Sequence, residues 1–158
     1  MKTIFAFLTL FFLCLCSFSQ KTNLSVQEKD VQISSAVEFF MYEGPYGQHE
    51  KINEPAIKFT LNVKNIGKSE IPDLCVSNRS QYVNFYIDDK KNNPLSMYNG
   101  IETIGDHMLG YGETDTYTWW IFVEDAYAKE FTVQWEYCNI FSNKHRVNID
   151  SKKVQVVK

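Results

Sequence analysis

The stretch Ile57-Lys58-Phe59-Thr60-Leu61-Asn62-Val63-Lys64 alternates apolar and polar side chains over its whole length. Because successive side chains of a β-strand point to opposite faces, this pattern predicts a strand with one buried and one solvated face. The same period of two recurs from about Tyr82 to Ile87 and at Phe131 to Tyr137. Three segments of this kind predict an all-β protein made of antiparallel sheets.

Further strands are expected on both sides of these segments. Val31 to Tyr42 mixes β-branched and aromatic residues, Thr114 to Val123 alternates, and a last strand is expected from about Arg146 to Val157. Asp88 to Pro94 is rich in turn-forming residues and predicts a hairpin that returns through Leu95 to Tyr98. About seven short strands, with turn signals every eight to twelve residues or so and no long helical period, predict an immunoglobulin-like β-sandwich.

The N-terminal segment 1–20 has the layout of a cleavable signal peptide. Lys2 is its single charge, an apolar run of about a dozen residues follows, and small and polar residues close it at Ser19 and Gln20. The run is shorter than the roughly twenty residues that a membrane-spanning helix needs. We therefore expect cleavage, a single domain at residues 21–158, no membrane span after cleavage, and a secreted or periplasmic location.

The four cysteines fall into two groups. Cys14 and Cys16 belong to the signal segment, and a leucine precedes each where a lipoprotein signal has a small residue, which argues against lipid attachment. Cys75 and Cys138 remain after cleavage, and an even pair in an exported chain predicts a disulfide that closes a loop of about 63 residues. Two buried thiols are the alternative. A zinc site would require paired ligand spacing that neither cysteine has.

Trp120 and Phe122 stand on a strand face that threonines otherwise mark as exposed to solvent. Tyr111 and Tyr98 are expected in nearby loops, and the four aromatic residues form a candidate binding patch for a protein or glycan partner. The alternative is a second small core, in which the first predicted strand or the segment Tyr42 to His49 covers Trp120 and Phe122.

Several functional classes find no support in the composition or motifs. The chain without its signal segment has 15 basic and 19 acidic residues and no cluster of Lys and Arg, so nucleic acid is not an expected partner. His49, His107 and His145 are far apart and lack neighbours at ligand spacing, so we expect neither a metal nor a cofactor. No Gly-x-Ser-x-Gly nucleophile motif occurs, and no catalytic residues are assigned.

Four segments combine into a family-like pattern: the strand Phe59 to Gly67 that ends in Lys-Asn-x-Gly, the charged hairpin Asp88 to Pro94, the turn Gly112 to Thr114, and the Trp-containing strand Phe131 to Trp135. Over Val31 to Val157 the chain resembles the secreted immunoglobulin-like domains of uncharacterised bacterial envelope proteins and mycobacterial immunoprotective antigens. It departs from them at Tyr111, where proline is usual. The resemblance implies a sandwich fold and a binding, adhesion or accessory role, and it brings no catalytic residues.

The sequence therefore predicts a non-catalytic, secreted or envelope-associated binding or structural module. The alternative is a small secreted inhibitor or ligand-capture protein that acts through loops at Gly44 to His49 and Gly105 to Gly112. An enzyme would need His107 or Asp106 to converge with another polar group in a cleft.

Overall fold

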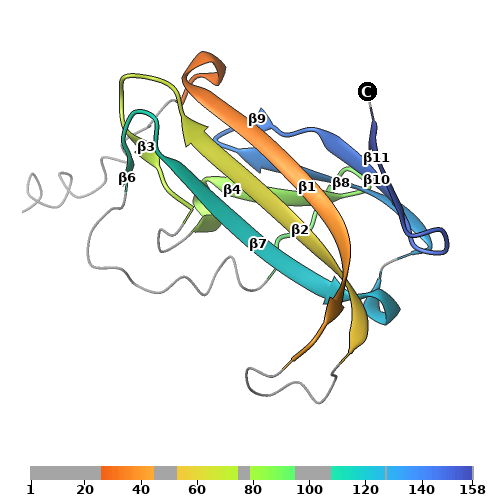
Figure 1. Ribbon diagram of the computed structural model, residues 1–158. Helices are drawn as coiled ribbons and strands as arrows, with labels where there is room; N and C mark the ends of the chain where they lie inside the picture. The colour runs from red at the N-terminus through yellow and green to blue at the C-terminus, as the bar shows by residue number, and fades with distance from the viewer. Residues whose placement is uncertain (1–25, 45–52, 75–78, 95–107, 127, 158) are drawn as a thin grey trace, which may run out of the picture.

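The computed structural model describes residues 26–44, 53–74, 79–94, 108–126 and 128–157, which fold mainly as β-strands (Figure 1). Seven strands have five residues or more, namely β1 (Val31–Tyr42), β2 (Glu54–Asn65), β4 (Val83–Ile87), β7 (Thr114–Phe122), β8 (Glu130–Tyr137), β10 (Lys144–Asn148) and β11 (Lys153–Val157). Four have two residues, namely β3 (Ile71–Pro72), β5 (Lys90–Lys91), β6 (Met108–Leu109) and β9 (Ile140–Phe141). Single 3-10 turns are η2 (Glu28–Asp30), η3 (Arg79–Gln81) and η5 (Val123–Asp125). The described part of the chain has no helix of the length and apolarity that a membrane crossing needs.

The longer strands form two antiparallel sheets that face each other (Figure 1). The smaller sheet has the order β1-β2-β7, and the larger has the order β11-β10-β8-β4-β5, with β9 paired to β8. A separate two-stranded ladder joins β3 to β6. The all-β class that the alternation predicts is confirmed, and the arrangement is that of a β-sandwich.

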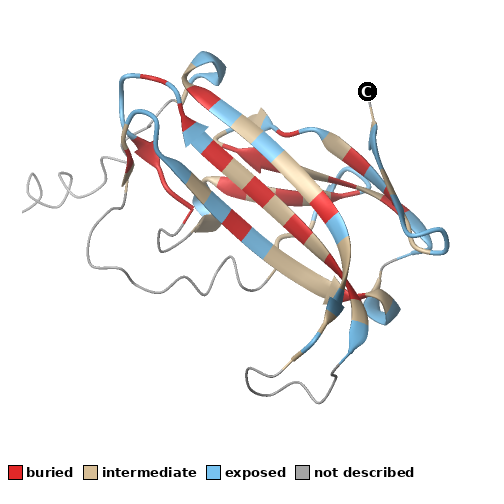
Figure 2. Ribbon diagram, viewed as in Figure 1, coloured by how far each residue is buried: buried red, intermediate tan, exposed pale blue. Residues whose placement is uncertain are grey.

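The core lies between the two sheets and contains the apolar residues that the alternation selects. Figure 2 shows buried residues recurring at every second position along much of β2, where Phe59 and Leu61 have no exposed surface. Aromatic rings meet across the two sheets: the ring centroids of Phe59 and Phe85 are 5.3 Å apart, and those of Tyr117 and Trp135 are 5.7 Å apart. Edge-to-face contacts of this kind add to the free energy gained from burial alone.

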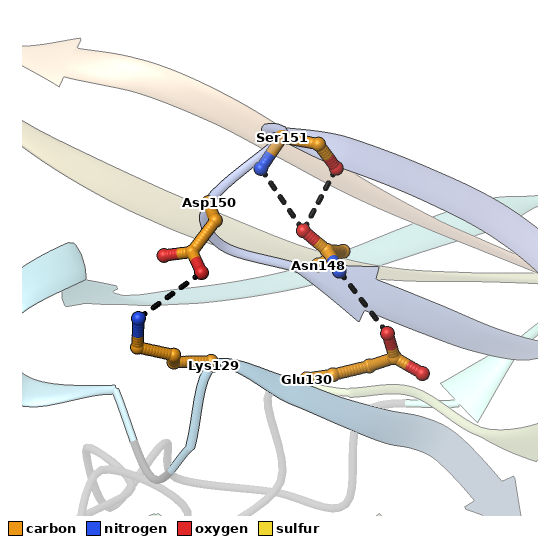
Figure 3. Close-up of polar contacts among 5 residues, drawn as sticks. All are labelled: Lys129, Glu130, Asn148, Asp150 and Ser151. Carbon is orange, nitrogen blue, oxygen red and sulfur yellow. Dashed lines mark hydrogen bonds and ion pairs between the residues drawn. The ribbon is translucent and has the colours of Figure 1, made fainter.

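The segment predicted as one last strand is instead a hairpin, which corrects that prediction. The side-chain oxygen of Asn148 accepts hydrogen bonds from the backbone nitrogen of Ser151 at 2.9 Å and from its hydroxyl at 2.8 Å (Figure 3). These bonds stabilise a turn between β10 and β11, as asparagine side chains commonly do. The apolar residues alternate on both sides of the turn but change from odd positions, Val147 and Ile149, to even positions, Val154 and Val156.

The hairpin after β4 is shorter than predicted. Its turn is formed by Asp88 and Asp89, whose φ angles are 47° and 62°, and Ile87 pairs with Lys90 on the returning strand β5. Aspartate tolerates positive φ better than most residues, which suits this tight turn. The predicted return through residues 95–98 lies outside the described residues, as does the predicted signal peptide.

A buried asparagine joins three segments at the end of β2. Asn65 is fully buried, and its side-chain amide donates to the carbonyl oxygens of Leu109 at 2.7 Å and Ser69 at 2.9 Å. Its side-chain oxygen accepts from the backbone nitrogen of Gly67 at 2.9 Å. Its backbone also bonds to the turn before β7, since the nitrogen of Gly112 donates to the Asn65 carbonyl at 2.8 Å. The side chain and backbone of this one residue therefore tie this end of the sandwich together.

Candidate functional site

An open groove lies on the outer face of the larger sheet. It has a volume of about 350 Å³ and is lined by Tyr86, Asp89, Gln134 and Phe141, and we call it the outer groove. Tyr86 on β4 is paired with Gln134 on β8, while Phe141 on β9 is paired with Glu136 on β8. Side chains of directly paired residues share a sheet face, so the register of three strands brings the two aromatic residues to either side of β8.

Two aromatic rings form the apolar part of the outer groove. The ring centroids of Tyr86 and Phe141 are 5.7 Å apart with the planes at 56°, and Phe141 keeps 54% of its surface exposed. Phe141 reaches this position because Cys138 and Asn139, with φ angles of 49° and 67°, form a tight turn that folds β9 back beside β8. Exposed aromatic residues on a rigid sheet are typical of recognition surfaces.

A buried carboxylate holds Tyr86 in place. Glu136 is only 7% exposed although it stands on the outer face, and one of its oxygens accepts from the Tyr86 hydroxyl at 2.5 Å and from the Asn84 amide at 3.1 Å. The hydrogen bond to the carboxylate raises the pKa of Tyr86 above its usual value of 10.0. Tyr86 therefore stays protonated and keeps a single orientation at neutral pH.

An ion pair and an ordered amide complete the outer groove. The Lys144 ammonium lies 2.5 Å from a carboxylate oxygen of Asp89, and the Gln134 amide nitrogen donates to the Ser142 carbonyl at 2.8 Å. Lys91 is paired with Tyr86 and so stands on the same face. The polar groups beside the rings are thus held by neighbours before any ligand arrives, which lowers the entropic cost of binding.

The structure places two residues of the predicted patch together on the other sheet. The rings of Trp120 and Phe122 lie 5.0 Å apart at the end of β7, and Tyr42 at the end of β1 packs on both, at 4.6 Å and 5.6 Å. Phe122 is buried and Trp120 is half-buried. Tyr42 thus covers part of this pair, as in the alternative of a second small core.

Tyr111 is not brought to that pair. It stands in the turn before β7, at the opposite end of this nine-residue strand from Phe122, and is 76% exposed. At about 3.3 Å per residue, the strand separates the two ends by roughly 30 Å. Tyr98 lies outside the described residues. The four aromatic residues therefore do not form a single patch in the described structure.

The predicted disulfide involves one residue that the structure describes. Cys138 is a half-buried thiol, and burial raises its pKa to about 11. Cys75 lies outside the described residues, and no disulfide joins any two residues inside them. The Cys75–Cys138 bridge therefore stays a prediction.

Among the described residues, Ser35 and His145 form the contact that most resembles the nucleophile and general base of a hydrolase. The Ser35 hydroxyl oxygen and the His145 Nε2 are 2.9 Å apart, across the gap between β1 and β10. The hydroxyl also lies 3.3 Å from the carbonyl oxygen of Asn143, to which it can only donate. With its hydrogen used there, Ser35 accepts from Nε2, so the histidine acts as the donor. This arrangement joins the two sheets and does not activate the hydroxyl.

A second, smaller hollow of about 180 Å³ lies beside the turn between β10 and β11. Its neighbouring polar groups bond to one another (Figure 3): Lys129 pairs with Asp150 at 3.2 Å, and Asn148 donates to Glu130 at 3.1 Å. These contacts stabilise the turn. Within the described ranges no three His, Cys, Asp or Glu side chains gather as a metal site would require.

The residues of the outer groove were not singled out from the sequence. The sequence does contain one signal for the site: Tyr86 is an aromatic residue on the face of its strand that the alternation predicts to be exposed to solvent. No family model, curated protein or solved structure matches this chain. Its function is therefore inferred from the geometry of the site.

Proposed function

We propose that this chain is an exported, non-catalytic binding module of immunoglobulin-like type, which holds its partner in the outer groove. The observation that carries the proposal is the pairing of an exposed aromatic side chain, Phe141, with polar groups that neighbours already hold in place. Binding sites in proteins combine an apolar surface with a few fixed polar groups in this way. The proposed export rests on the signal-like segment 1–20.

The strand order supports the immunoglobulin-like type. In such sandwiches, strands A, B and E lie in one sheet and strands C, F and G in the other. Taking β1, β2 and β7 as A, B and E, and β4, β8 and β10 as C, F and G, reproduces both sheets in the observed order. Strand β11 extends the larger sheet beyond this set.

The non-catalytic role is supported by the chemistry of the described polar contacts. The Ser35 hydroxyl is directed to a backbone carbonyl, and Glu136 accepts hydrogen bonds from Asn84 and Tyr86. Tyr86 is correspondingly held as a donor to that carboxylate. These groups are arranged to stabilise the sandwich and to orient the groove.

A photo-crosslinking experiment tests the proposal. One variant carries benzoylphenylalanine in place of Phe141, and a second carries it in place of Tyr111. Cells that produce and export each variant are illuminated. The proposal expects an adduct at position 141 and little at position 111, although Tyr111 is the more exposed residue. An adduct that is equal at both positions, or absent at 141, contradicts it. Circular dichroism checks that both variants fold.

The second candidate function, an inhibitor that acts through its loops, is favoured by the position of Tyr111. The turn that carries it is tied to buried Asn65 by the hydrogen bond from Gly112, and the Gly110 nitrogen donates to Glu113 at 2.7 Å. A rigid turn that presents an aromatic side chain is suited to insertion into a pocket of a partner protein. An adduct at position 111 alone would favour this second function.

A further inference from the structure

We infer that the ligand of the outer groove is a neutral carbohydrate, bound with the apolar face of a sugar ring against Phe141 and Tyr86. This inference rests on the proposed function and adds the chemical class of the ligand. It is drawn from three properties of the groove: the aromatic surface, the kind of hydrogen-bonding atoms beside it, and the balance of charges around it.

The exposed aromatic surface can pack against the apolar face of a sugar ring. Phe141 is 54% exposed and its ring lies beside that of Tyr86 on a sheet face, in an open groove of about 350 Å³. Such a groove is at the small end of ligand sites and suits one or two sugar units of a chain that extends into solvent. The C–H groups of a pyranose form an apolar face that packs on aromatic rings, while its hydroxyls point outward along the edge.

Two side chains beside the rings have a hydrogen-bond acceptor that no described neighbour uses. The Gln134 amide nitrogen donates to the Ser142 carbonyl, which leaves the Gln134 side-chain oxygen as an acceptor for a ligand. One carboxylate oxygen of Asp89 is bonded to Lys144, and no other contact within the described residues uses the second. Hydroxyl groups are donors that satisfy such atoms. A purely apolar ligand would bury these acceptors without partners, which is costly.

The charges around the outer groove favour a neutral ligand. Two carboxylates, Asp89 and Glu136, stand on this face with two ammonium groups, Lys91 and Lys144, so that the formal charges cancel. A cationic ligand that stacks on aromatic rings gains most where anionic groups are unopposed. An acidic ligand would need an excess of basic groups. Neither excess is present beside Tyr86 and Phe141.

The test uses the chain with the signal segment removed and an array of immobilised neutral oligosaccharides, acidic oligosaccharides and a choline conjugate. We expect binding to one or more neutral oligosaccharides. In a titration of the best of these, Phe141→Ala should weaken the Kd at least tenfold, because the stacking surface is lost. Val156→Ala, which trims an apolar residue with 58% exposure on β11, is the matched control and should leave the Kd unchanged.

The outcomes separate this inference from the proposed function. Binding to acidic oligosaccharides or choline alone, or no binding to any neutral oligosaccharide, overturns the carbohydrate inference. If position 141 still forms a photo-crosslink in that case, the groove binds another class of partner and the proposed function stands. A Kd that Phe141→Ala leaves unchanged also overturns the inference, because the sugar then binds elsewhere. Circular dichroism and thermal unfolding of Phe141→Ala exclude loss of fold as the cause.

Discussion

The Ser35 hydroxyl oxygen lies 2.9 Å from the His145 Nε2 and joins the edge strand of one sheet to the other sheet. His145 is 6% exposed, and its Nδ1 is buried without a hydrogen-bond partner in the described structure. A neutral ring with its hydrogen on Nε2 suits this site, because Nδ1 then carries only a lone pair. A second proton would place an N–H group where nothing accepts it.

Protonation of His145 should therefore weaken the fold at acidic pH. Burial lowers the pKa of His145 below its unfolded value of 6.5. The unfolded chain then binds more protons between the two pKa values, so stability is complete above about pH 6.5 and falls as the pH decreases toward the folded pKa. The free energy of unfolding should fall by up to about 1.4 kcal/mol per pH unit in this window. Urea unfolding at several pH values between 5 and 8 measures it.

A glutamine at position 145 is the matched control. His145→Gln keeps an amide nitrogen near the position of Nε2 and does not titrate. Its stability should depend less on pH between about 5 and 6.5 than that of the natural chain. Equal pH dependence in the two proteins would show that other groups cause the acid sensitivity.

Replacement of Asn65 by alanine should destabilise the protein strongly. Asn65→Ala removes, at a fully buried position, the amide that donates to the Leu109 and Ser69 carbonyls, while the Gly67 nitrogen keeps its bond to the Asp30 carbonyl. Each unsatisfied buried group costs roughly 1–3 kcal/mol, so a loss of about 3 kcal/mol is expected. Asn62→Ala is the control, because Asn62 bonds Thr116 at an exposed position on the same strand. Chemical unfolding should show a loss below about 1 kcal/mol for that variant, and similar losses for both would contradict the role assigned to Asn65.

Most of the core could be predicted because a sheet with one buried face imposes a period of two on its sequence. The strand Val31–Tyr42 begins and ends at the predicted residues, and the strand predicted from about Tyr82 begins one residue later, at Val83, and ends at Ile87. Asn65 and Gly67, which belong to the Lys-Asn-x-Gly pattern of the family resemblance, are also required by the packing at their end of the sandwich. Asn65 bonds the Gly67 backbone, and a Cβ at Gly67 would lie 2.5 Å from the Asp30 Cβ.

The outer groove could not be predicted because it depends on which strands become neighbours. Tyr86 and Phe141 meet only because β4 and β9 both pair with β8, and no local pattern specifies that register. The predicted patch wrongly placed Tyr111 beside Phe122, because the extended strand β7 lies between them and holds them at its opposite ends. Alternation identifies the face of a side chain but not its position along the sheet.

Removal of the charge on Glu136 should lower the pKa of Tyr86. The carboxylate accepts the Tyr86 hydroxyl hydrogen at 2.5 Å, and this bond is the largest cause of the raised pKa. In Glu136→Gln the tyrosinate no longer faces a negative charge, so its pKa should move down toward 10.0. NMR of ring-labelled tyrosine resolves the titration, with Tyr86→Phe identifying the signal. An unchanged pKa would mean that the carboxylate does not control Tyr86.

The mass of the exported protein should show both signal cleavage and the Cys75–Cys138 bridge. Cleavage near Ser19 or Gln20 removes the segment that carries Cys14 and Cys16. Alkylation must be carried out in denaturant, because burial raises the pKa of Cys138 to about 11 and a buried thiol reacts slowly even when it is free. A bridged protein gains no alkyl group until it is reduced, and then it gains two.

Urea unfolding of the oxidised and the reduced protein measures how much the bridge stabilises the fold. A closed loop of about 63 residues should stabilise the fold by about 4 kcal/mol in the chain-entropy model, so reduction should lower the urea midpoint markedly. Cys138→Ser is the control and should be alkylated once, at Cys75, without reductant. Two alkyl groups on the unreduced natural chain in denaturant would contradict the bridge. The high pKa of Cys138 would then make it an inert thiol of the folded protein, since too little thiolate is present near neutral pH to react.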